Sequence, residues 1–266
     1  MSKENQPQKS SRILLIGDSC IDEYIFGTCD RISPEAPVPI FCESRREIRP
    51  GMSLNVQANL QNLGNDVTLL TSKKKGKKTR YVSENTLHHL LRVDQDIVIT
   101  PLEVYEVNEN RLSTYDAVII SDYNKGFLTR HVANAICRKC AGSQIPVFVD
   151  TKKKDTSCFC NAILKVNQYE KALITKYPLF YTLITTLGAN GAMLDDEVFP
   201  AIENDVVDGY GRRDVCGAGD TFMSALVHKY LKNGRDLRDA VVFANKCASV
   251  VVSRFGTVAI KTGDVE

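Results

Sequence analysis

The sequence lacks any apolar stretch approaching the roughly 18 residues that a helix needs to cross a bilayer. Its first residues, MSKENQPQKSS, are polar and lack the apolar core of a secretory signal. It also lacks a strong charge of either sign, because 34 Lys and Arg against 32 Asp and Glu leave a net charge of +2. Nucleic-acid binding usually needs a larger basic field. We therefore expect a cytoplasmic protein whose partners are small molecules, and neither a membrane nor a nucleic acid.

The nine cysteines are odd in number and come without a secretory signal. This favours free thiols in a reducing compartment over a disulfide framework. Two pairs, Cys137 with Cys140 and Cys158 with Cys160, would together offer four sulfur ligands to zinc. The first pair falls in a helical pattern with no tight turn, which disfavours that interpretation.

Short β-branched runs alternate with helical patterns along the chain, with no internal repeat. This alternation is typical of βαβ units in a mostly parallel sheet that helices cover on both faces, and we expect one principal domain over residues 1–266. Ser53 can cap one helix, which Gly64 ends, and Thr129 can cap another that runs to Gly142. The expected strands are 12–17, 67–70, 117–121, 146–150, 162–167 and 181–187.

Two segments, about 24–49 and 78–96, break the alternation with short β-prone pieces. Because they follow the first and second core strands, we expect them to pair into a small β lid over the carboxyl edge of the sheet, where open α/β folds bind ligands. The lysine-rich run 72–78 is interpreted as a solvated loop, with phosphate binding as the alternative.

The most specific motif is 214–221, DVCGAGDT, which a strong helical pattern follows at once. The backbone N–H groups of Gly217, Ala218 and Gly219 would then lie at a helix N-terminus, which attracts anions. Asp220 would repel phosphate there, but it makes sense as the base that takes a proton from an attacking hydroxyl. The alternatives are an ordinary first-turn helix acid, or a dinucleotide fingerprint that lacks its third glycine and its preceding strand.

Two further strand ends carry groups suited to a nucleotide. Asn167 and Glu170 follow an apolar strand three residues apart, and can orient metal-bound water if they open a helical turn. The turn that contains Gly188 and Gly191 ends the next strand, where glycines permit contact between backbone and nucleotide.

A second cluster of polar residues suits a sugar. Asp18 and Asp22 leave the first strand, and Gly51 turns the chain toward Asn55 in a helix. Carboxylates and amides together can hold neighbouring hydroxyls by paired hydrogen bonds. The alternative is local capping, in which Asp18 and Asn55 serve only nearby backbone groups.

These motifs, in this order, resemble the PfkB (ribokinase-like) carbohydrate kinases over nearly the whole chain. Within that family the sequence looks most like the heptose 7-phosphate kinase branch, the kinase half of the bifunctional enzyme of ADP-heptose synthesis. The segments that carry the narrower resemblance are RISPEAPVP at 31–39, RPG at 49–51, SDYNKG at 121–126 and FAN at 243–245.

The resemblance implies a role for each matching position. It implies Asp220 as the base and Gly217, Ala218 and Gly219 as the anion hole, with ATP and Mg²⁺ as cofactors. Asn167 and Glu170 would lie near magnesium and phosphate. The nucleotide pocket would be lined by Thr186, Gly188, Gly191 and Asn245. Sugar hydroxyls would be held by Asp22, Gly51 and Asn55, with Asp18 and Lys125 as weaker candidates. Asp214 matches a position that in several relatives lies beside a monovalent cation such as K⁺.

The sequence departs from the family in two places. Met52 stands where the family usually has a second glycine, and the stretch between Leu70 and Arg92 is short enough to lack a helix and a strand. We expect a three-layer α/β kinase that transfers the γ-phosphoryl group of Mg-ATP to a sugar or sugar-phosphate hydroxyl and can form a homodimer through its lid. The alternatives are a non-catalytic binding or regulatory descendant and, more distantly, a Rossmann oxidoreductase.

Overall fold

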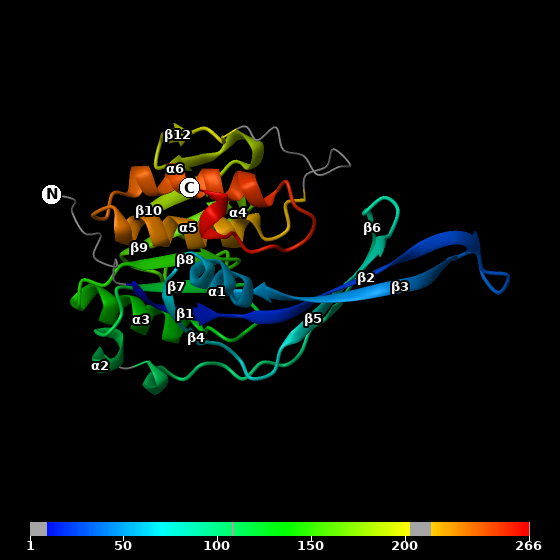
Figure 1. The fold of residues 1–266 in the computed structure, drawn as a ribbon. Coiled ribbons are helices and arrows are strands. Elements are labelled where there is room, and N and C mark those ends of the chain that lie inside the picture. The colour runs from blue at the N-terminus through cyan, green and yellow to red at the C-terminus, as the bar shows by residue number, and fades with distance from the viewer. Residues whose placement is uncertain (1–9, 108, 203–213, 266) are drawn as a thin grey trace.

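Two β-sheets organise the chain in the computed structural model, which describes residues 10–107, 109–202 and 214–265 (Figure 1). The larger sheet has eight strands in the order β12-β11-β10-β9-β8-β7-β1-β4. Six of them are parallel and two, at one edge, are antiparallel. The parallel strands are β1 (Arg12–Gly17), β4 (Asp66–Leu70), β7 (Ala117–Asp122), β8 (Val147–Thr151), β9 (Ala162–Asn167) and β10 (Tyr181–Thr186); the edge pair is β11 (Ala192–Leu194) and β12 (Glu197–Phe199).

Helices cover both faces of this sheet, which confirms the expected three layers. Successive residues of β1 point to opposite faces, so that Ile13 and Leu15 join one buried cluster while Leu14 and Ile16 join the other. The first cluster includes residues of α1 (Ser53–Asn62), α5 (Ala218–Lys232) and α6 (Leu237–Val251), and the second includes residues of α3 (Arg130–Gly142). The remaining short elements are α2 (Glu109–Leu112), α4 (Gln168–Leu173), and the 3₁₀ turns η1 (Val104–Glu106), η2 (Gly188–Asn190) and η3 (Thr262–Asp264).

The second sheet is the expected lid, with its strands in the order β3-β2-β5-β6. Figure 1 shows β2 and β3 reaching well beyond the larger sheet on the right. Its own buried cluster is small, namely Tyr24, Phe26 and Val82, with Leu87 and Phe255 packed against it. Residues 71–75 connect β4 directly to β5. The lid strands are β2 (Ser19–Ile32), β3 (Pro39–Met52), β5 (Gly76–Ser83) and β6 (His89–Gln95).

One helix start differs from its prediction. Thr129 caps α3 as expected, since its Oγ1 accepts the N–H of Val132 at 3.3 Å. Ser53, however, is the first residue of α1 and not its cap; Met52 occupies the cap position, and Ser53 Oγ has no hydrogen-bond partner in the described part of the chain. The prediction was wrong because lid strand β3 continues to Met52 and leads straight into the helix.

The thiols and the helices give two further findings. All nine cysteines are free, and four of them, Cys20, Cys137, Cys140 and Cys247, have exposed fractions of 3% or less.

Within the described residues, no helix is both long enough and apolar enough to span a membrane.

Candidate active site

The N-terminus of α5 is built around a glycine. Gly217 caps the helix with φ 79°, and a Cβ added there would lie 2.9 Å from Asn55 Nδ2, so that a larger residue would collide. The Ala218 N–H donates to Val215 O at 3.2 Å, and the Thr221 N–H donates to Gly217 O at 2.9 Å. The N–H groups of Gly219 and Asp220 lie in the first turn of α5, ahead of the residue that makes the first hydrogen bond of the helix. They therefore have no carbonyl group of the helix to donate to. Of the three amides predicted to form an anion hole, that of Ala218 therefore already has an acceptor; the anion hole itself stays a prediction.

Asp220 is held from two sides. Asn55 Nδ2 donates to its Oδ2 at 2.9 Å, and Tyr123 Oη donates to its Oδ1 at 2.8 Å. The residue is only 6% exposed. Burial raises the pKa of Asp220 to about 6, although both hydrogen bonds oppose the rise. A carboxyl group with this pKa is ionised near neutral pH and is a stronger base than an ordinary aspartate.

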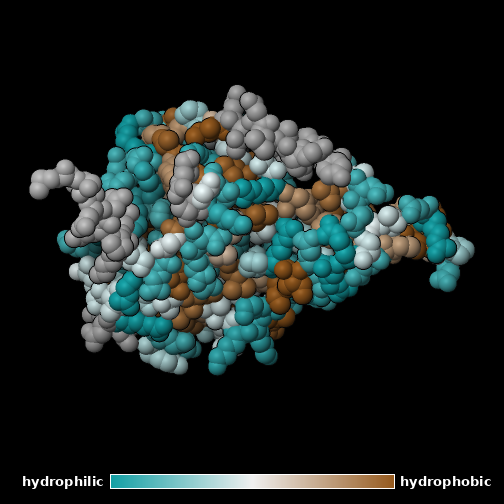
Figure 2. All heavy atoms as spheres, in the orientation of Figure 1, coloured by the Kyte–Doolittle hydropathy of each residue, from teal (hydrophilic) through white to brown (hydrophobic). Residues whose placement is uncertain are grey.

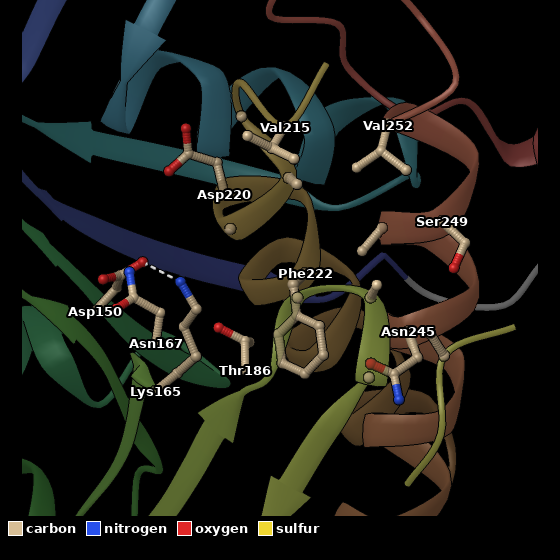
Figure 3. A pocket seen from close by; sticks show the side chains of 18 of the residues that line it. Asp150, Lys165, Asn167, Thr186, Val215, Asp220, Phe222, Asn245, Ser249 and Val252 are labelled. Atoms are coloured by element: carbon tan, nitrogen blue, oxygen red, sulfur yellow. Dashed lines mark hydrogen bonds and ion pairs between the residues drawn. The ribbon is translucent and has the colours of Figure 1, made fainter. Parts of the chain in front are cut away.

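A lysine lies directly beside Gly219. A Cβ added at Gly219 would be 2.9 Å from Lys165 Nζ, and Lys165 Nζ lies 2.5 Å from Asp150 Oδ2. Figure 3 shows this pair, with Asn167 next to it, on one side of the pocket. The sequence motifs did not reveal Asp150 or Lys165, since both stand inside runs that read as buried strands. Their place at the carboxyl ends of adjacent strands β8 and β9 was the available signal.

Asn167 and Glu170 form a reciprocal cap on α4. Asn167 Oδ1 accepts the Glu170 N–H at 2.8 Å, and Glu170 Oε2 accepts the Asn167 N–H at 2.9 Å. Glu170 Oε1 also contacts Lys152 Nζ. Asn167 lines the pocket, and Glu170 is not among its lining residues.

The donors beside Lys165 fit a magnesium ion that is bound mainly through phosphate and water. Asp150 Oδ1 is buried without a hydrogen-bond partner in the described residues, although Lys152 Nζ lies 3.5 Å away. Among those residues no group of three or more His, Cys, Asp or Glu side chains forms a complete metal site. Mg²⁺ is commonly bound by one or two carboxylates together with substrate phosphates. Asp150 and Asn167 would hold it here.

The pocket itself has a volume of about 800 Å³, enough for a nucleotide. Figure 3 shows Asp150, Asn167 and Lys165 on one side of the pocket and Val252, Ser249 and Asn245 on the other, with Asp220 and Val215 above. This cavity is lined by the four residues predicted to line a nucleotide pocket: Thr186, Gly188, Gly191 and Asn245. That a nucleotide binds there stays a prediction.

Two of these residues also shape the wall. Asn245 Nδ2 donates to Phe199 O at 2.9 Å and to Pro200 O at 3.3 Å. Gly191 has φ 91°, and a Cβ there would lie 2.2 Å from Phe199 O. Both therefore hold the end of β12 against the pocket.

The residues predicted to bind sugar have partners within the protein. Asp18 accepts the N–H of Lys125 at 3.1 Å, and Asp22 pairs with Arg80 Nη1 at 2.6 Å. Both aspartates are buried, while Gly51 packs so closely that a Cβ would lie 2.6 Å from Cys20 Sγ.

A second, much smaller cavity of about 20 Å³ lies between lid strands and the loop residues Asp96, Ile97, Ile99 and Lys125. Its lining includes Met52, Lys77, Lys78 and Lys125, and Lys125 Nζ pairs with Asp96 at 2.7 Å. Of the residues predicted to bind sugar, only Lys125 lines it. The roles of the others stay predictions.

Asp214, the predicted neighbour of a monovalent cation, joins two loops. Its Oδ1 accepts the Cys216 N–H at 2.9 Å and its Oδ2 accepts the Gly256 N–H at 2.7 Å. Burial favours the neutral acid, but these hydrogen bonds outweigh it and lower the pKa of Asp214.

Two solved structures have a similar fold. One is phosphofructokinase-2 from Escherichia coli in complex with potassium, with a TM-score of 0.72, 16% identity and coverage of 96% of this chain and 97% of that chain. The other is Arabidopsis thaliana ribokinase complexed with ribose and ATP, with a TM-score of 0.68, 14% identity and coverage of 97% and 98%. The fold is ribokinase-like.

The sequence comparisons give the family. Residues 103–262 match the pfkB family carbohydrate kinases. The chain is 32% identical over 306 aligned positions to the bifunctional protein HldE of Campylobacter fetus subsp. fetus (strain 82-40), which covers 96% of this chain. The chain belongs to the PfkB family of carbohydrate kinases, phosphotransferases that act on a sugar.

The match to HldE is partial in two respects. The chain spans about 65% of the length of that relative. The 306 aligned positions also exceed the 266 residues of this chain, so the relative contains segments that this chain lacks even within the aligned region.

Proposed function

We propose that this protein transfers the γ-phosphoryl group of Mg-ATP to a hydroxyl of a sugar or sugar phosphate, with Asp220 as the general base. The observation that carries the proposal is the position of Asp220, a buried carboxylate with a raised pKa at the entrance to a helix N-terminus. An anion-binding site alone has no use for a carboxylate there.

Each group at the polar end then has a task. Asp220 accepts the proton of the acceptor hydroxyl as its oxygen attacks phosphorus and the bond to the leaving ADP oxygen breaks. The N–H groups of Gly219 and Asp220 and the Lys165 ammonium stabilise the charge on the transferring group. Bound Mg²⁺ neutralises charge on the phosphates. Asp150 and Asn167 would hold that ion, and Asp214 would lie beside a K⁺ ion.

The acceptor should carry a negative charge. Lys77, Lys78 and Lys125 all line the small cavity. Lys77 pairs with Glu23 and Lys125 with Asp96, so Lys78 is the cation of this lining that is left to attract a negatively charged group. A heptose 7-phosphate is the acceptor that the resemblance to the heptose kinase branch implies.

A coupled assay of ADP release over a panel of sugars and sugar phosphates tests the proposal. We expect turnover with at least one phosphorylated acceptor, and weaker binding of the corresponding unphosphorylated sugar. Binding of ATP without turnover on any acceptor would favour a non-catalytic descendant instead.

A second copy of the chain is the proposed partner of the lid. Ile48 is 69% exposed and Leu91 57% exposed, both on lid strands. Figure 2 shows hydrophobic residues, in brown, among hydrophilic ones toward the lid end on the right. Burial of these residues between two lids would stabilise a homodimer. Sedimentation analysis should give a dimer that Ile48→Lys weakens, and a wild-type monomer at all concentrations would refute it.

A further inference from the structure

Asp122 and Lys153 form a buried ion pair that has no task in the phosphoryl transfer described above. The Asp122 side chain is 0% exposed and that of Lys153 is 11% exposed, and Lys153 Nζ donates to Asp122 Oδ2 at 2.6 Å. Thr151 Oγ1 donates to the same oxygen at 2.8 Å. Neither member of the pair lines the pocket of Asp220 or the small cavity. Because a buried ion pair is weak evidence for stability, its place in the fold is the guide to its role.

The pair lies at the base of the segment that carries Tyr123. Asp122 is the last residue of β7, and its Oδ1 accepts the Asn124 N–H at 3.0 Å. This bond spans Tyr123 and closes a turn in which Asn124 has φ 58°, in the left-handed region. Lys153 joins the same carboxylate to the chain that follows β8. One side chain therefore holds the backbone on both sides of Tyr123.

Asp18 holds the other end of this segment. Its Oδ2 accepts the Lys125 N–H at 3.1 Å, and its Oδ1 accepts the Phe127 N–H at 3.4 Å. The N–H of Asp18 itself donates to Ser121 O at 3.1 Å. Two buried carboxylates, those of Asp18 and Asp122, thus fix the two ends of residues 122–127.

Tyr123 depends on this backbone for its place beside the proposed base. Its hydroxyl donates to Asp220 Oδ1 at 2.8 Å, and its ring has the ammonium groups of Lys78 and Lys152 at 5.4 Å from its centre. Both lysines are long, flexible side chains, so they do not fix the ring. Since a hydrogen bond weakens steeply outside its usual distance and angle, a small shift of the backbone at Tyr123 would break the bond to Asp220.

We propose that Asp122, together with Lys153, is a positioning residue: the pair fixes Tyr123 so that its hydroxyl holds the Asp220 carboxylate in place for the acceptor. The inference rests on the proposed function. Without the pair, Asn55 Nδ2 would be the remaining side-chain donor to Asp220 among the described residues. The carboxylate would then be a base of different strength and less certain orientation.

Two double variants test the inference. Asp122→Ala/Lys153→Met removes the pair and leaves no charge unpaired. Asp122→Asn/Lys153→Met removes the same charges but keeps an oxygen for the Asn124 N–H, so a difference between the two variants reports the position of Tyr123. Carboxyl ¹³C NMR titration measures the pKa of Asp220, whose resonance is identified by its loss in Asp220→Asn. We expect the alanine variant to raise this pKa by about one unit, since a hydrogen bond to the charged form is lost, and the asparagine variant to leave it unchanged.

The Tyr123→Phe background makes the test specific. A pair that acts through the Tyr123 hydroxyl should cause no further shift once that hydroxyl is gone. The other titratable groups that act on Asp220, which stay in place in every variant, are Asp150, Lys165, Lys152 and Cys20. Lys229→Met/Asp239→Ala removes a surface ion pair between α5 and α6 outside both cavities; it is the control and should not shift the pKa of Asp220.

Activity supplies a second readout. With an acceptor that is turned over, the alanine variant should lose at least about 10-fold in kcat through misplacement of the base, while its affinity for an ATP analogue stays unchanged. The asparagine variant should retain the kcat of the wild type.

The outcomes separate the inference from the proposed function. A wild-type pKa of Asp220 in the alanine variant would overturn the inference, as would a further shift of equal size in Tyr123→Phe. If the alanine variant does not fold, Asp18→Asn takes its place, because it keeps the side-chain volume and loses one of two acceptors at the other end of the segment. Loss of a negative charge alone would lower the pKa of Asp220, so the expected rise reports Tyr123, and its absence would overturn the inference. The expected shifts in a protein that phosphorylates no acceptor would overturn the proposed function and leave the control of Asp220 by the pair standing.

Discussion

Tyr123 joins the proposed base to the lid. Its hydroxyl donates to Asp220 Oδ1 at 2.8 Å, and Lys78 of lid strand β5 lies 5.4 Å from the centre of its ring. Lys152 lies at the same distance from that ring. Tyr123 is thus placed to control the basicity of Asp220 and to respond to the position of the lid.

Replacement of Tyr123 by phenylalanine should change the pH dependence of catalysis. The hydrogen bond from Tyr123 lowers the pKa of Asp220, so its loss should raise that pKa above about 6 and move the acid limb of kcat/KM to higher pH. Tyr177→Phe, which alters a tyrosine stacked on Tyr181 outside the pocket, is the control. An acid limb that stayed in place in Tyr123→Phe would show that the contact does not tune the base.

Asp220 should also affect how stability depends on pH. Because its pKa in the folded protein, about 6, lies above the ordinary 3.8, folding favours the protonated form. Its ionisation therefore lowers the free energy of unfolding as pH rises from about 4 to about 7, by up to roughly 3 kcal/mol at 1.36 kcal/mol per pKa unit. Asparagine does not titrate. Chemical denaturation should thus show Asp220→Asn gaining stability relative to wild type over that range, and a constant difference would contradict the raised pKa.

Lys165 should contribute to turnover through its charge, although its side chain is buried. Loss of its charge beside the anion hole should lower kcat about 10²-fold, the scale of other groups that stabilise a developing charge. Lys165→Met alone would leave the buried Asp150 with only the Lys152 ammonium, 3.5 Å from its Oδ1. The Asp150→Asn/Lys165→Met double variant removes both charges together and guards against unfolding. Lys154→Met, at an exposed lysine outside the pocket, is the control. Wild-type turnover in Lys165→Met would exclude a role in phosphoryl transfer.

The lid should be open to solvent until substrates bind. Every residue of β6 is exposed, and the buried cluster of the lid contains only three residues, Tyr24, Phe26 and Val82. We expect fast hydrogen exchange over residues 78–96 that slows when ATP analogue and acceptor are both present, and measurable ATP hydrolysis without acceptor. A lid fully protected in the free monomer, with no background hydrolysis, would refute this expectation.

The sequence was sufficient for the parts of the fold that repeat a strong pattern. The parallel strands, both lid segments and the start of α5 follow from hydrophobic runs and glycine placement. The β11–β12 pair was missed because each strand has only three residues, too few to show a period. The Ser53 cap was predicted wrongly because strand pairing up to Met52 overrides a local capping preference.

The site was less accessible to sequence reasoning. Asp220 and the pocket glycines stand in a recognisable motif, but Asp150 and Lys165 look like core positions, and only the parallel register of β8 with β9 brings them together. Likewise, no local pattern predicts that Tyr123 reaches Asp220 across 97 positions of sequence.

Turnover by Asp220→Asn, measured beside its binding of an ATP analogue, tests the central claim most directly. We predict unchanged affinity for the analogue and a loss of kcat of at least about 10²-fold on the best acceptor, because the hydroxyl would lose its proton acceptor. Turnover close to that of the wild type, with a folded variant, would contradict the assignment of Asp220 as the catalytic base.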